Sequence, residues 1–362
     1  MGRSGPVQQL NLQAGELVEV RSVEEILATL DENGRLEAMP FMPEMLQYCG
    51  KQFRVFKVAH KTCDNIQPWN MRTVKNAVHL TGVRCDGQLH GSCDAGCLIF
   101  WNEAWLKRVG SGFLKESQIG ECGSALPQAL PAPASSGTLA IPEVLQRASR
   151  KGQDPASGEA IYSCQATDLR EFTSDLPSWN LWQYVRDIRS GNLNRGLGDS
   201  KGEKLLEVFL GMVDVLRTLL IEVFNMFQSV RKGVQYPHVQ ALPAATPAGE
   251  LNLRPGEFVQ VKSRQEIFAT LDQKNRNRGL LFDSEMLKYC GGTFRVLKRV
   301  NQIVDEKNGK MLRMKSSCII LDGSACAADY HKLCPRAIYH YWREGWLRRV
   351  GEDGNLSGSD RI

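Results

Sequence analysis

The protein has 362 residues, of which 42% are hydrophobic and 23% are charged, a composition typical of a globular protein with two or three domains. Its formal net charge of +5 is too small to indicate nucleic-acid binding by itself. The first residues lack the apolar stretch of a secretory signal, and no uncharged run approaches the length of a transmembrane helix. We therefore expect a cytoplasmic protein without a transmembrane segment.

An internal repeat dominates the organisation of the chain. Residues 10–110 align without a gap to residues 251–351, at an offset of 241, and about 40 of the 101 aligned pairs are identical. Two copies of about 100 residues each, separated by unrelated sequence, indicate a duplicated small domain rather than a solenoid. The sequence predicts a first module at 1–112 and a second module at 251–353.

Within the first copy, the expected elements are short. Alternation of apolar and polar residues over 16–21 predicts a strand, and Ser22 with Glu25 forms a capping box that begins a short helix. A second short helix is expected near 44–48, and further strands are expected at 53–59, 74–84 and 104–109. This order predicts an α+β protein built from two homologous, β-rich modules of the SH3-like barrel type, joined by a linker and a helical segment.

The stretch CDGQLHGSCDAGC at 85–97 concentrates residues that bind metals. Cysteine thiolates and imidazoles suit zinc, and clustered cysteines in a reducing compartment favour metal binding or catalysis over disulfides. Three of these residues recur in the second copy inside otherwise divergent sequence. The shared residues are Cys85, His90 and Cys93 in the first copy, and Cys326, His331 and Cys334 in the second.

The fourth ligand is open. A hairpin that sets Cys63 opposite Arg72 would bring Cys49 beside Cys85, and Cys49 recurs as Cys290. This register predicts a structural Cys3His zinc site in each copy. Cys97, which the second copy lacks, is the competing fourth ligand of the first copy, and Cys63 is a third candidate; in the second copy His340 would then substitute.

Three other interpretations of the cluster compete with structural zinc. A catalytic metal would need a general base, and of the nearby Asp86, Asp94 and Glu103 only Glu103 recurs, between tryptophans in a segment that is typical of core packing. Cys93 and Cys97 could form a redox disulfide, although their spacing is not that of thioredoxin-like proteins. The cysteines could also be ordinary core residues. We favour a closed structural site.

The middle of the chain divides into a linker and a folded segment. Residues 113–157 are rich in Pro, Ala, Ser and Gly, which predicts a flexible linker. The segment 158–240 is aromatic and then helical. We expect Trp179, Trp182 and Tyr184 to be core or docking residues, with a stacking site for a ligand as the alternative.

A long amphipathic helix is predicted at 201–232, with a capping box at Ser200 and Glu203 and a stop at Gly233. Its circumference is apolar except for a narrow polar stripe, so burial in the protein, or contact with a protein partner or a second copy, is expected. The acidic residues of the stripe argue against the remaining alternative, an anionic membrane surface. The stripe consists of Glu207, Gly211, Asp214, Thr218, Glu222 and Asn225.

After a short linker at 241–250, the second module carries the basic excess of the chain, and 354–362 is expected to be a flexible tail. Basic residues near aromatic ones could bind nucleic acid or another polyanion, although a solvated charged surface is the commoner case. The candidate residues are Lys274, Arg276, Arg278, Lys298, Arg299, Arg348 and Arg349.

These features together favour a non-catalytic binding or scaffold protein with structural zinc in one or both modules, contacting a protein or a polyanion. The alternative is a metal-dependent enzyme, or an accessory protein of a biosynthetic pathway, that uses the cluster at 85–97. A cleft with an open coordination position would favour the enzyme, whereas four protein ligands closed around the metal would favour binding.

Overall fold

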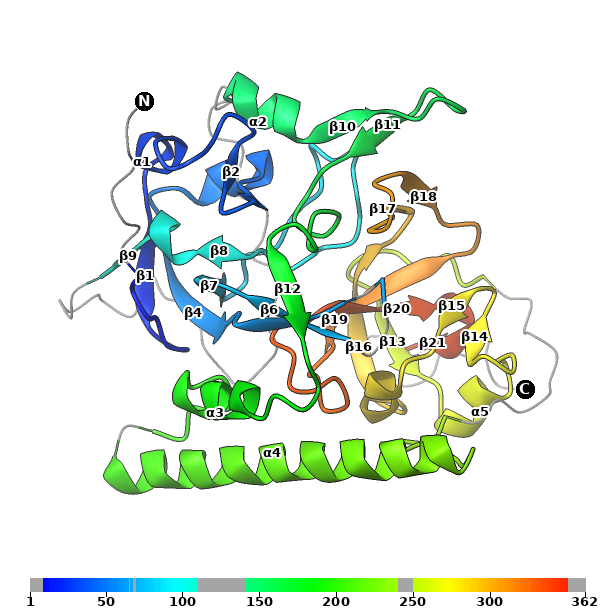
Figure 1. Ribbon diagram of the computed structural model, residues 1–362. Coiled ribbons are helices and arrows are strands. Elements are labelled where there is room, and N and C mark those ends of the chain that lie inside the picture. Colours follow the sequence, from blue (N-terminus) through cyan, green and yellow to red (C-terminus); the bar gives the residue numbers. More distant parts are fainter. Residues whose placement is uncertain are drawn as a thin grey trace. The chain divides into compact units, whose positions relative to one another are not determined.

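The computed structural model describes residues 9–64, 66–67, 70–109, 141–198, 200–239 and 250–350. The protein is mixed α/β with antiparallel sheets (Figure 1). Its chain divides into two compact units. The first unit comprises the described residues up to Val215 together with Val304–Leu312 and Cys334–Arg336; the second comprises the remaining described residues. The predicted linker at 241–250 and the tail at 354–362 lie outside the described residues, apart from residue 250.

A five-stranded antiparallel sheet is the centre of the first unit. Its strands are short. Side chains at 17–20 alternate between half-buried and buried, as the sequence pattern predicts, whereas those at 77–80 are all buried. In spatial order the strands are β8 (Trp101–Asn102), β7 (Ala77–Leu80), β4 (Gln52–Val58), β1 (Leu17–Val20) and β9 (Leu106–Arg108).

Smaller sheets and short helices complete the first unit. The sheets are β12 (Thr173–Leu176) with β6 (Met71–Val74) and β5 (Lys61–Cys63), β10 (Arg150–Gln153) with β11 (Ala160–Tyr162), and β2 (Arg35–Leu36) with β3 (Met39–Pro40). The helices are α1 (Val23–Leu27), η1 (Pro43–Tyr48), η2 (Glu103–Trp105), α2 (Glu143–Ala148) and α3 (Trp182–Arg189). Helix α2 and strand β10 fall inside the stretch at 113–157 that the composition predicts to be a linker.

The second unit repeats the same sheet order. Its strands are β20 (Tyr339–Arg343), β19 (Cys318–Ala325), β16 (Thr293–Arg299), β13 (Phe258–Val261) and β21 (Leu347–Arg349). Strands β14 (Arg276–Asn277) and β15 (Leu280–Leu281) form a hairpin, and the helices are α5 (Arg264–Phe268), η4 (Ser284–Tyr289) and η5 (Glu344–Trp346). Strands β17 (Gln302–Val304) and β18 (Met311–Arg313) form a further hairpin, of which Val304–Leu312 belong to the first unit. The pairs Val18–Phe53 and Val259–Phe294 occupy equivalent registers, 241 residues apart.

Local signals in the sequence act as expected in both units. The capping box of Ser22 and Glu25 begins α1, and the equivalent box of Ser263 and Glu266 begins α5. The predicted second helix forms as η1, a 3-10 helix. The predicted strand register is off by one residue in part, because β5 sets Cys63 opposite Met71 rather than Arg72.

An aromatic cluster fills each core. Phe41 contacts the indole of Trp105 edge to face, with ring centroids 5.2 Å apart, and Phe282 contacts Trp346 in the same way at 5.4 Å. Between the tryptophans of the first unit, Glu103 is buried and accepts hydrogen bonds from the backbone nitrogens of Leu10, Asn11 and Leu12. Its carboxylate therefore fixes residues 10–12 onto the core, which is a structural role.

Helix α3 is anchored to the first unit through a fully buried ion pair. The Lys61 ammonium lies 2.6 Å from the Asp187 carboxylate and 4.7 Å from the centre of the Tyr184 ring. His60 contacts the same carboxylate at 3.3 Å, and burial together with Lys61 lowers the pKa of His60 to about 3. Of the three aromatic residues expected to be core or docking residues, only Tyr184 is buried; Trp179 and Trp182 are exposed.

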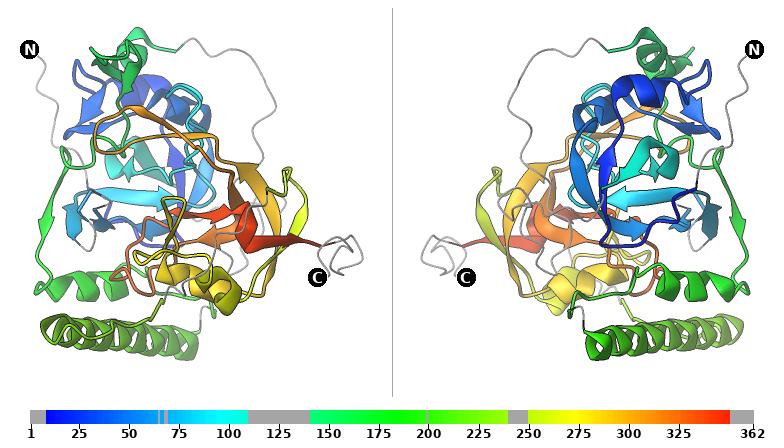
Figure 2. Two further views of the ribbon diagram at one scale, coloured as in Figure 1. Left: turned by 90° about the vertical axis from the view of Figure 1, so that its right-hand side faces the viewer. Right: turned by 90° about the vertical axis from the view of Figure 1, so that its left-hand side faces the viewer.

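Helix α4 (Lys201–Val230) has the predicted capping box, since Ser200 and Glu203 exchange hydrogen bonds between backbone and side chain. Its first half lies beside α3, as Figures 1 and 2 both show, and Gly211 packs on Leu193. The expectation that its apolar circumference is buried is wrong: the polar stripe faces the protein and the apolar side is exposed. Within the described chain, no helix is long and apolar enough to cross a membrane.

A buried histidine in the first sheet makes the stability of the protein depend on pH. The Nδ1 atom of His79 donates to the Ile99 carbonyl at 2.8 Å, its Nε2 is buried without a hydrogen-bond partner, and burial lowers its pKa from 6.5 to about 3. As the pH falls from about 6.5 to about 3, the unfolded chain therefore binds a proton that the folded chain does not, and the free energy of unfolding decreases.

The test is urea unfolding of the natural chain and of His79→Ile across this pH range. Isoleucine occupies the equivalent position 320 and is buried there, so it suits the core. We expect the pH dependence to be shallower in His79→Ile, whereas replacement of the exposed His238 by Gln should leave it unchanged. Equal slopes for the natural chain and His79→Ile would contradict the prediction.

Candidate metal centres

Three side chains with metal-binding atoms meet in the first unit. Glu44, Cys85 and His90 each offer one ligand atom, and these atoms all lie within 4.8 Å of one another. Glu44 comes from η1, whereas Cys85 and His90 come from the loop that follows β7. Glu44 and His90 are buried and Cys85 is partly buried, so an occupying ion would be shielded from solvent.

Backbone hydrogen bonds hold the group in place. The Cys85 nitrogen donates to the Cys97 carbonyl at 2.8 Å, which closes the loop at its base. The nitrogens of His90 and Cys93 both donate to the carbonyl of Gly87, and the φ of +71° at Gly87 allows the tight turn that precedes them. The loop is therefore a compact, internally bonded structure that presents its side chains in fixed directions.

Both ring nitrogens of His90 contact an oxygen atom, and these contacts fix the orientation of the imidazole. Its Nδ1 lies 2.5 Å from a Glu44 carboxylate oxygen, and its Nε2 lies 3.0 Å from the carbonyl oxygen of Ser163. Histidines that bind metals through one nitrogen commonly donate from the other to a backbone carbonyl or a carboxylate. Nδ1 is therefore the atom available to an ion in this group.

An equivalent group occupies the second unit, formed by Glu285, Cys326 and His331. The Cys326 thiol lies 3.3 Å from Nδ1 of His331, and Nε2 of the same ring lies 3.5 Å from the Asp283 carboxylate. The ring orientation thus repeats that of His90, with Nδ1 towards the group and Nε2 towards an oxygen acceptor. Although burial alone lowers it, the hydrogen bonds of the ring to Asp283 and Cys326 raise the pKa of His331 to about 11.

The carboxylates of both groups share an incomplete hydrogen-bond pattern. One oxygen of Glu44 accepts from the Leu89 nitrogen, and one oxygen of Glu285 accepts from the Tyr330 nitrogen. In each case the other oxygen, Oε2, is buried with no hydrogen-bond partner, and that of Glu285 lies 3.9 Å from the Lys288 ammonium. Buried polar atoms are rarely left unsatisfied, and a bound cation would satisfy both of these oxygens. The equivalent carboxylate oxygen therefore lacks a hydrogen-bond partner in both copies, at positions 241 residues apart.

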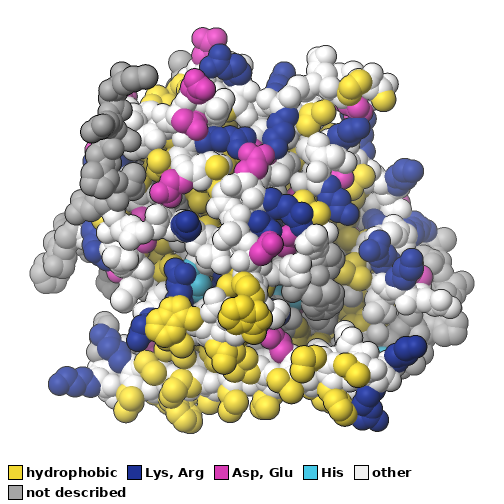
Figure 3. All heavy atoms as spheres, viewed as in Figure 1, with side chains coloured by type: hydrophobic (Ala, Val, Ile, Leu, Met, Phe, Trp, Pro, Cys, Tyr) yellow, Lys and Arg dark blue, Asp and Glu magenta, His cyan; other side chains and the backbone are white. Residues whose placement is uncertain are grey.

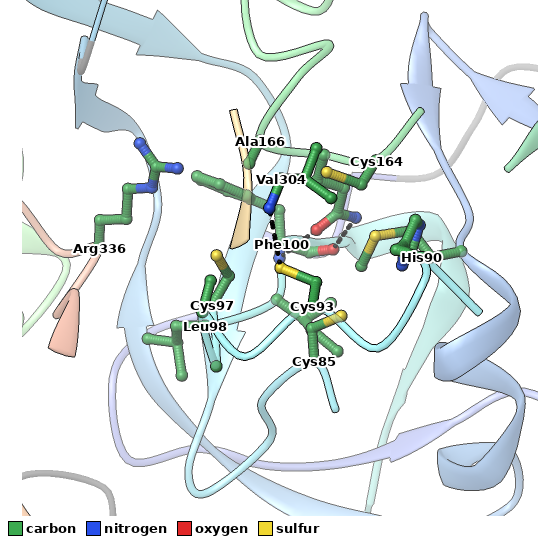
Figure 4. A pocket seen from close by; sticks show the side chains of 15 residues that line it. Cys85, His90, Cys93, Cys97, Leu98, Phe100, Cys164, Ala166, Val304 and Arg336 are labelled. Atoms are coloured by element: carbon green, nitrogen blue, oxygen red, sulfur yellow. Dashed lines mark hydrogen bonds between the residues drawn. The ribbon is translucent and has the colours of Figure 1, made fainter. Parts of the chain in front are cut away.

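A small cavity adjoins the first group. It has a volume of about 30 Å³, which suits a single ion or water molecule, and it lies within the first unit. Figure 4 shows four thiols around it, with His90 at one side. The four are Cys85, Cys93, Cys97 and Cys164.

Burial keeps three of these thiols protonated when no ion is bound. It raises the pKa of Cys97 to about 12, that of Cys164 to about 11, and that of Cys85 well above its usual value. A cation would reverse this effect, because thiolate is the form that binds metal. Metal binding at this cavity would therefore release protons.

The predicted ligands are brought together only in part. Cys85 pairs with His90 and Cys326 with His331, as expected, but neither described group contains Cys49 or Cys290. Cys93 and Cys334 instead occupy equivalent sulfur contacts in the first unit: the Cys93 sulfur accepts from the Val304 nitrogen at 3.4 Å, and the Cys334 sulfur accepts from the Cys63 nitrogen at 3.2 Å.

The sequence analysis did not identify two kinds of candidate ligand. Glu44 and Glu285 align in the repeat, so the identical Glu-Met-Leu stretches could have suggested them, but they are distant in sequence from the cysteine cluster. Cys164 lies outside the repeat and has no counterpart, so the sequence contains no signal that places it near Cys93 or Cys97.

The predicted polyanion-binding residues fall into two kinds. Arg299, Arg348 and Arg349 are paired with Glu344, Glu266 and Glu257, respectively, and thus contribute to the internal structure of the second unit. Lys274, Arg276 and Arg278 are exposed around the β14–β15 hairpin, and Lys298 is half-buried. Binding of nucleic acid or another polyanion stays a prediction.

No family model, curated protein or solved structure matches the chain. The function must therefore be inferred from the geometry of its own residues.

Proposed function

We propose that the protein is a non-catalytic binding or scaffold protein made of two related, SH3-like modules, each stabilised by a metal ion, and that the metal is zinc. One observation carries the proposal: the same Glu, Cys and His group recurs at an offset of 241 residues, with the same imidazole orientation and with the equivalent carboxylate oxygen buried without a hydrogen-bond partner. Thiolate, imidazole and carboxylate are ligands that zinc accepts.

In the first unit, a thiol at the cavity supplies the fourth ligand and closes the site. Cys93, Cys97 and Cys164 are the candidates, because all three line the cavity next to Cys85 and His90. Four protein ligands would leave no position for a substrate, which favours a structural role. Small domains gain much of their stability from such an ion.

The second candidate function is metal-dependent catalysis. It is favoured by the fact that each described group has three ligand atoms, since three protein ligands and one open position are typical of catalytic zinc. The two candidate functions predict different effects of replacing the cavity thiols. If one of them is a ligand, its replacement by Ser should weaken metal retention; an open site would be insensitive to all three replacements.

Metal analysis of the purified full chain tests the proposal. We expect zinc in the natural chain, loss of one equivalent in Cys85→Ser and of one in Cys326→Ser, because each change removes a ligand from a different group. Cys49→Ser and Cys290→Ser are the matched controls, since these thiols lie outside both groups and should retain the metal. A natural chain without metal would refute the proposal. Loss of metal in Cys49→Ser, with retention in Cys85→Ser, would refute this ligand set.

A further inference from the structure

The solvent side of α4 is a continuous apolar face, and this feature is independent of the metal groups. At 100° per residue, its exposed apolar side chains span an arc of about 160°. Leu205, Leu220 and Val230, spread along the helix, are 71%, 61% and 82% exposed. Figure 3 shows hydrophobic side chains along this helix. The exposed apolar residues are Leu205, Leu206, Val208, Phe209, Met212, Val213, Leu216, Leu220, Val223, Phe224, Met226, Phe227 and Val230.

The opposite side of the helix explains why the apolar face points outward. Glu207 is buried and accepts a hydrogen bond from the Leu197 nitrogen at 2.9 Å, and Thr218 is also buried. Asp214 pairs with Arg195 at 2.8 Å, and Glu222 lies 3.9 Å from a lysine ammonium of the second unit. The polar stripe is thus used in contacts with the protein, which removes the acidic residues from the outer face.

The outer face consequently carries only positive charge. Among the described residues of α4 and its two following positions, the exposed ones include no aspartate or glutamate. The exposed cations are Lys201, Lys204, Arg217, Arg231 and Lys232. At 100° per residue, Lys201, Arg217 and Arg231 lie within or beside the apolar arc, whereas Lys204 and Lys232 lie on the side of the polar stripe. Large apolar side chains bordered by Lys and Arg are the pattern of helices that lie in the headgroup region of a membrane.

Exposed tryptophans near the start of α3 add to the apolar face of α4. Trp179 is 81% exposed, and Leu181 and Trp182 at the start of α3 are more than half exposed. Helix α3 lies beside the first half of α4 (Figures 1 and 2). Exposed tryptophan is costly in water but is enriched at membrane interfaces, where the ring sits among headgroups.

We propose that α4, with the exposed residues at the start of α3, binds the surface of a membrane that contains anionic lipid. The helix would lie in the plane of the interface, with its apolar arc among the acyl chains and its lysines and arginines at the headgroup phosphates. Pairing with a second copy fits less well. An arc of about 160° is wider than the seam of a two-helix contact, and face-to-face copies would bring only like charges together.

Co-sedimentation of the full chain with vesicles tests the proposal. We expect binding to vesicles of phosphatidylcholine and phosphatidylserine, and much weaker binding to phosphatidylcholine alone. Phe209→Glu and Leu216→Glu should each weaken binding about tenfold or more, because each places a charge in the apolar arc. Ser229→Glu is the control, since it adds the same charge on the side of the helix away from the arc. Lys201→Gln with Arg231→Gln should weaken binding about fivefold per removed charge.

Two results would overturn the proposal. One is a folded natural chain that binds neither kind of vesicle. The other is a dimer in analytical ultracentrifugation that Leu216→Glu dissociates while vesicles do not bind, which would make the face a contact between copies. Tryptophan emission gives a second readout: vesicles should shift it to the blue in the natural chain, and the shift should shrink in Trp179→Phe/Trp182→Phe.

Discussion

Replacing Asp187 with alanine should lower the free energy of unfolding by about 3–5 kcal/mol, the typical cost of removing one partner from a buried ion pair. Lys61, the partner, has a fully buried side chain, and its ammonium lies 2.6 Å from the carboxylate. Without Asp187 the ammonium must lose its proton or draw water into the core, and both are unfavourable. Urea unfolding followed by circular dichroism measures the change.

The double variant Lys61→Met/Asp187→Ala distinguishes an unpaired charge from lost packing. Methionine removes the charge but keeps most of the side-chain volume, so we expect the double variant to recover a large part of the lost stability. If the double variant is as unstable as Asp187→Ala, or if Asp187→Ala unfolds like the natural chain, the ion pair does not anchor α3.

Replacing Glu103 with alanine should cost about 3 kcal/mol or more, because the change leaves three backbone nitrogens without their acceptor. The carboxylate accepts from Leu10 and Asn11 through one oxygen, at 2.8 and 2.9 Å, and from Leu12 through the other, at 3.1 Å. Leu12 is itself buried, so water cannot replace the bond without opening the core. Urea unfolding should show a lower midpoint with little change in slope.

The repeat offers a comparison for this prediction. Glu344 accepts from the backbone nitrogens of Asn252 and Leu253 and pairs with Arg299, so Glu344→Ala should destabilise the second unit in the same way. Glu103→Gln keeps one acceptor oxygen and should fall between the natural chain and Glu103→Ala. A loss below about 1 kcal/mol in Glu103→Ala would contradict the structural role.

Much of the local structure could be predicted from the sequence. The predicted capping box at Ser22 and the predicted start of α4 at Lys201 were correct, because each depends on side chains within a few residues of one another. The strand register was correct at Val55–Leu80, but a shift within the β4–β7 pair puts it off by one at Lys57–His79, and it is off by one in the other direction at Cys63–Met71.

Which side of α4 faces the protein could not be predicted from local sequence. An apolar circumference favours burial when only the helix is considered, yet the acidic and small residues of the stripe fit specific partners on the body of the protein. Those partners, such as the Leu197 nitrogen and the Leu193 side chain, have no signature in the sequence. Burial of the stripe exposes the apolar arc, and the exposed arc is what favours a lipid surface.

The two candidate metal-binding groups were likewise predictable only in part. From the sequence alone, Cys85 and His90 were predicted to lie together, with Cys326 and His331 as their counterparts, because two copies of one pattern reveal which residues are shared, and each pair does meet in one group. Only the tertiary structure brought Glu44 and Glu285 to these residues and placed Cys164 at the cavity. The physical reason is distance along the chain: a ligand set assembled from separate elements depends on how those elements pack, and packing is decided by the whole core.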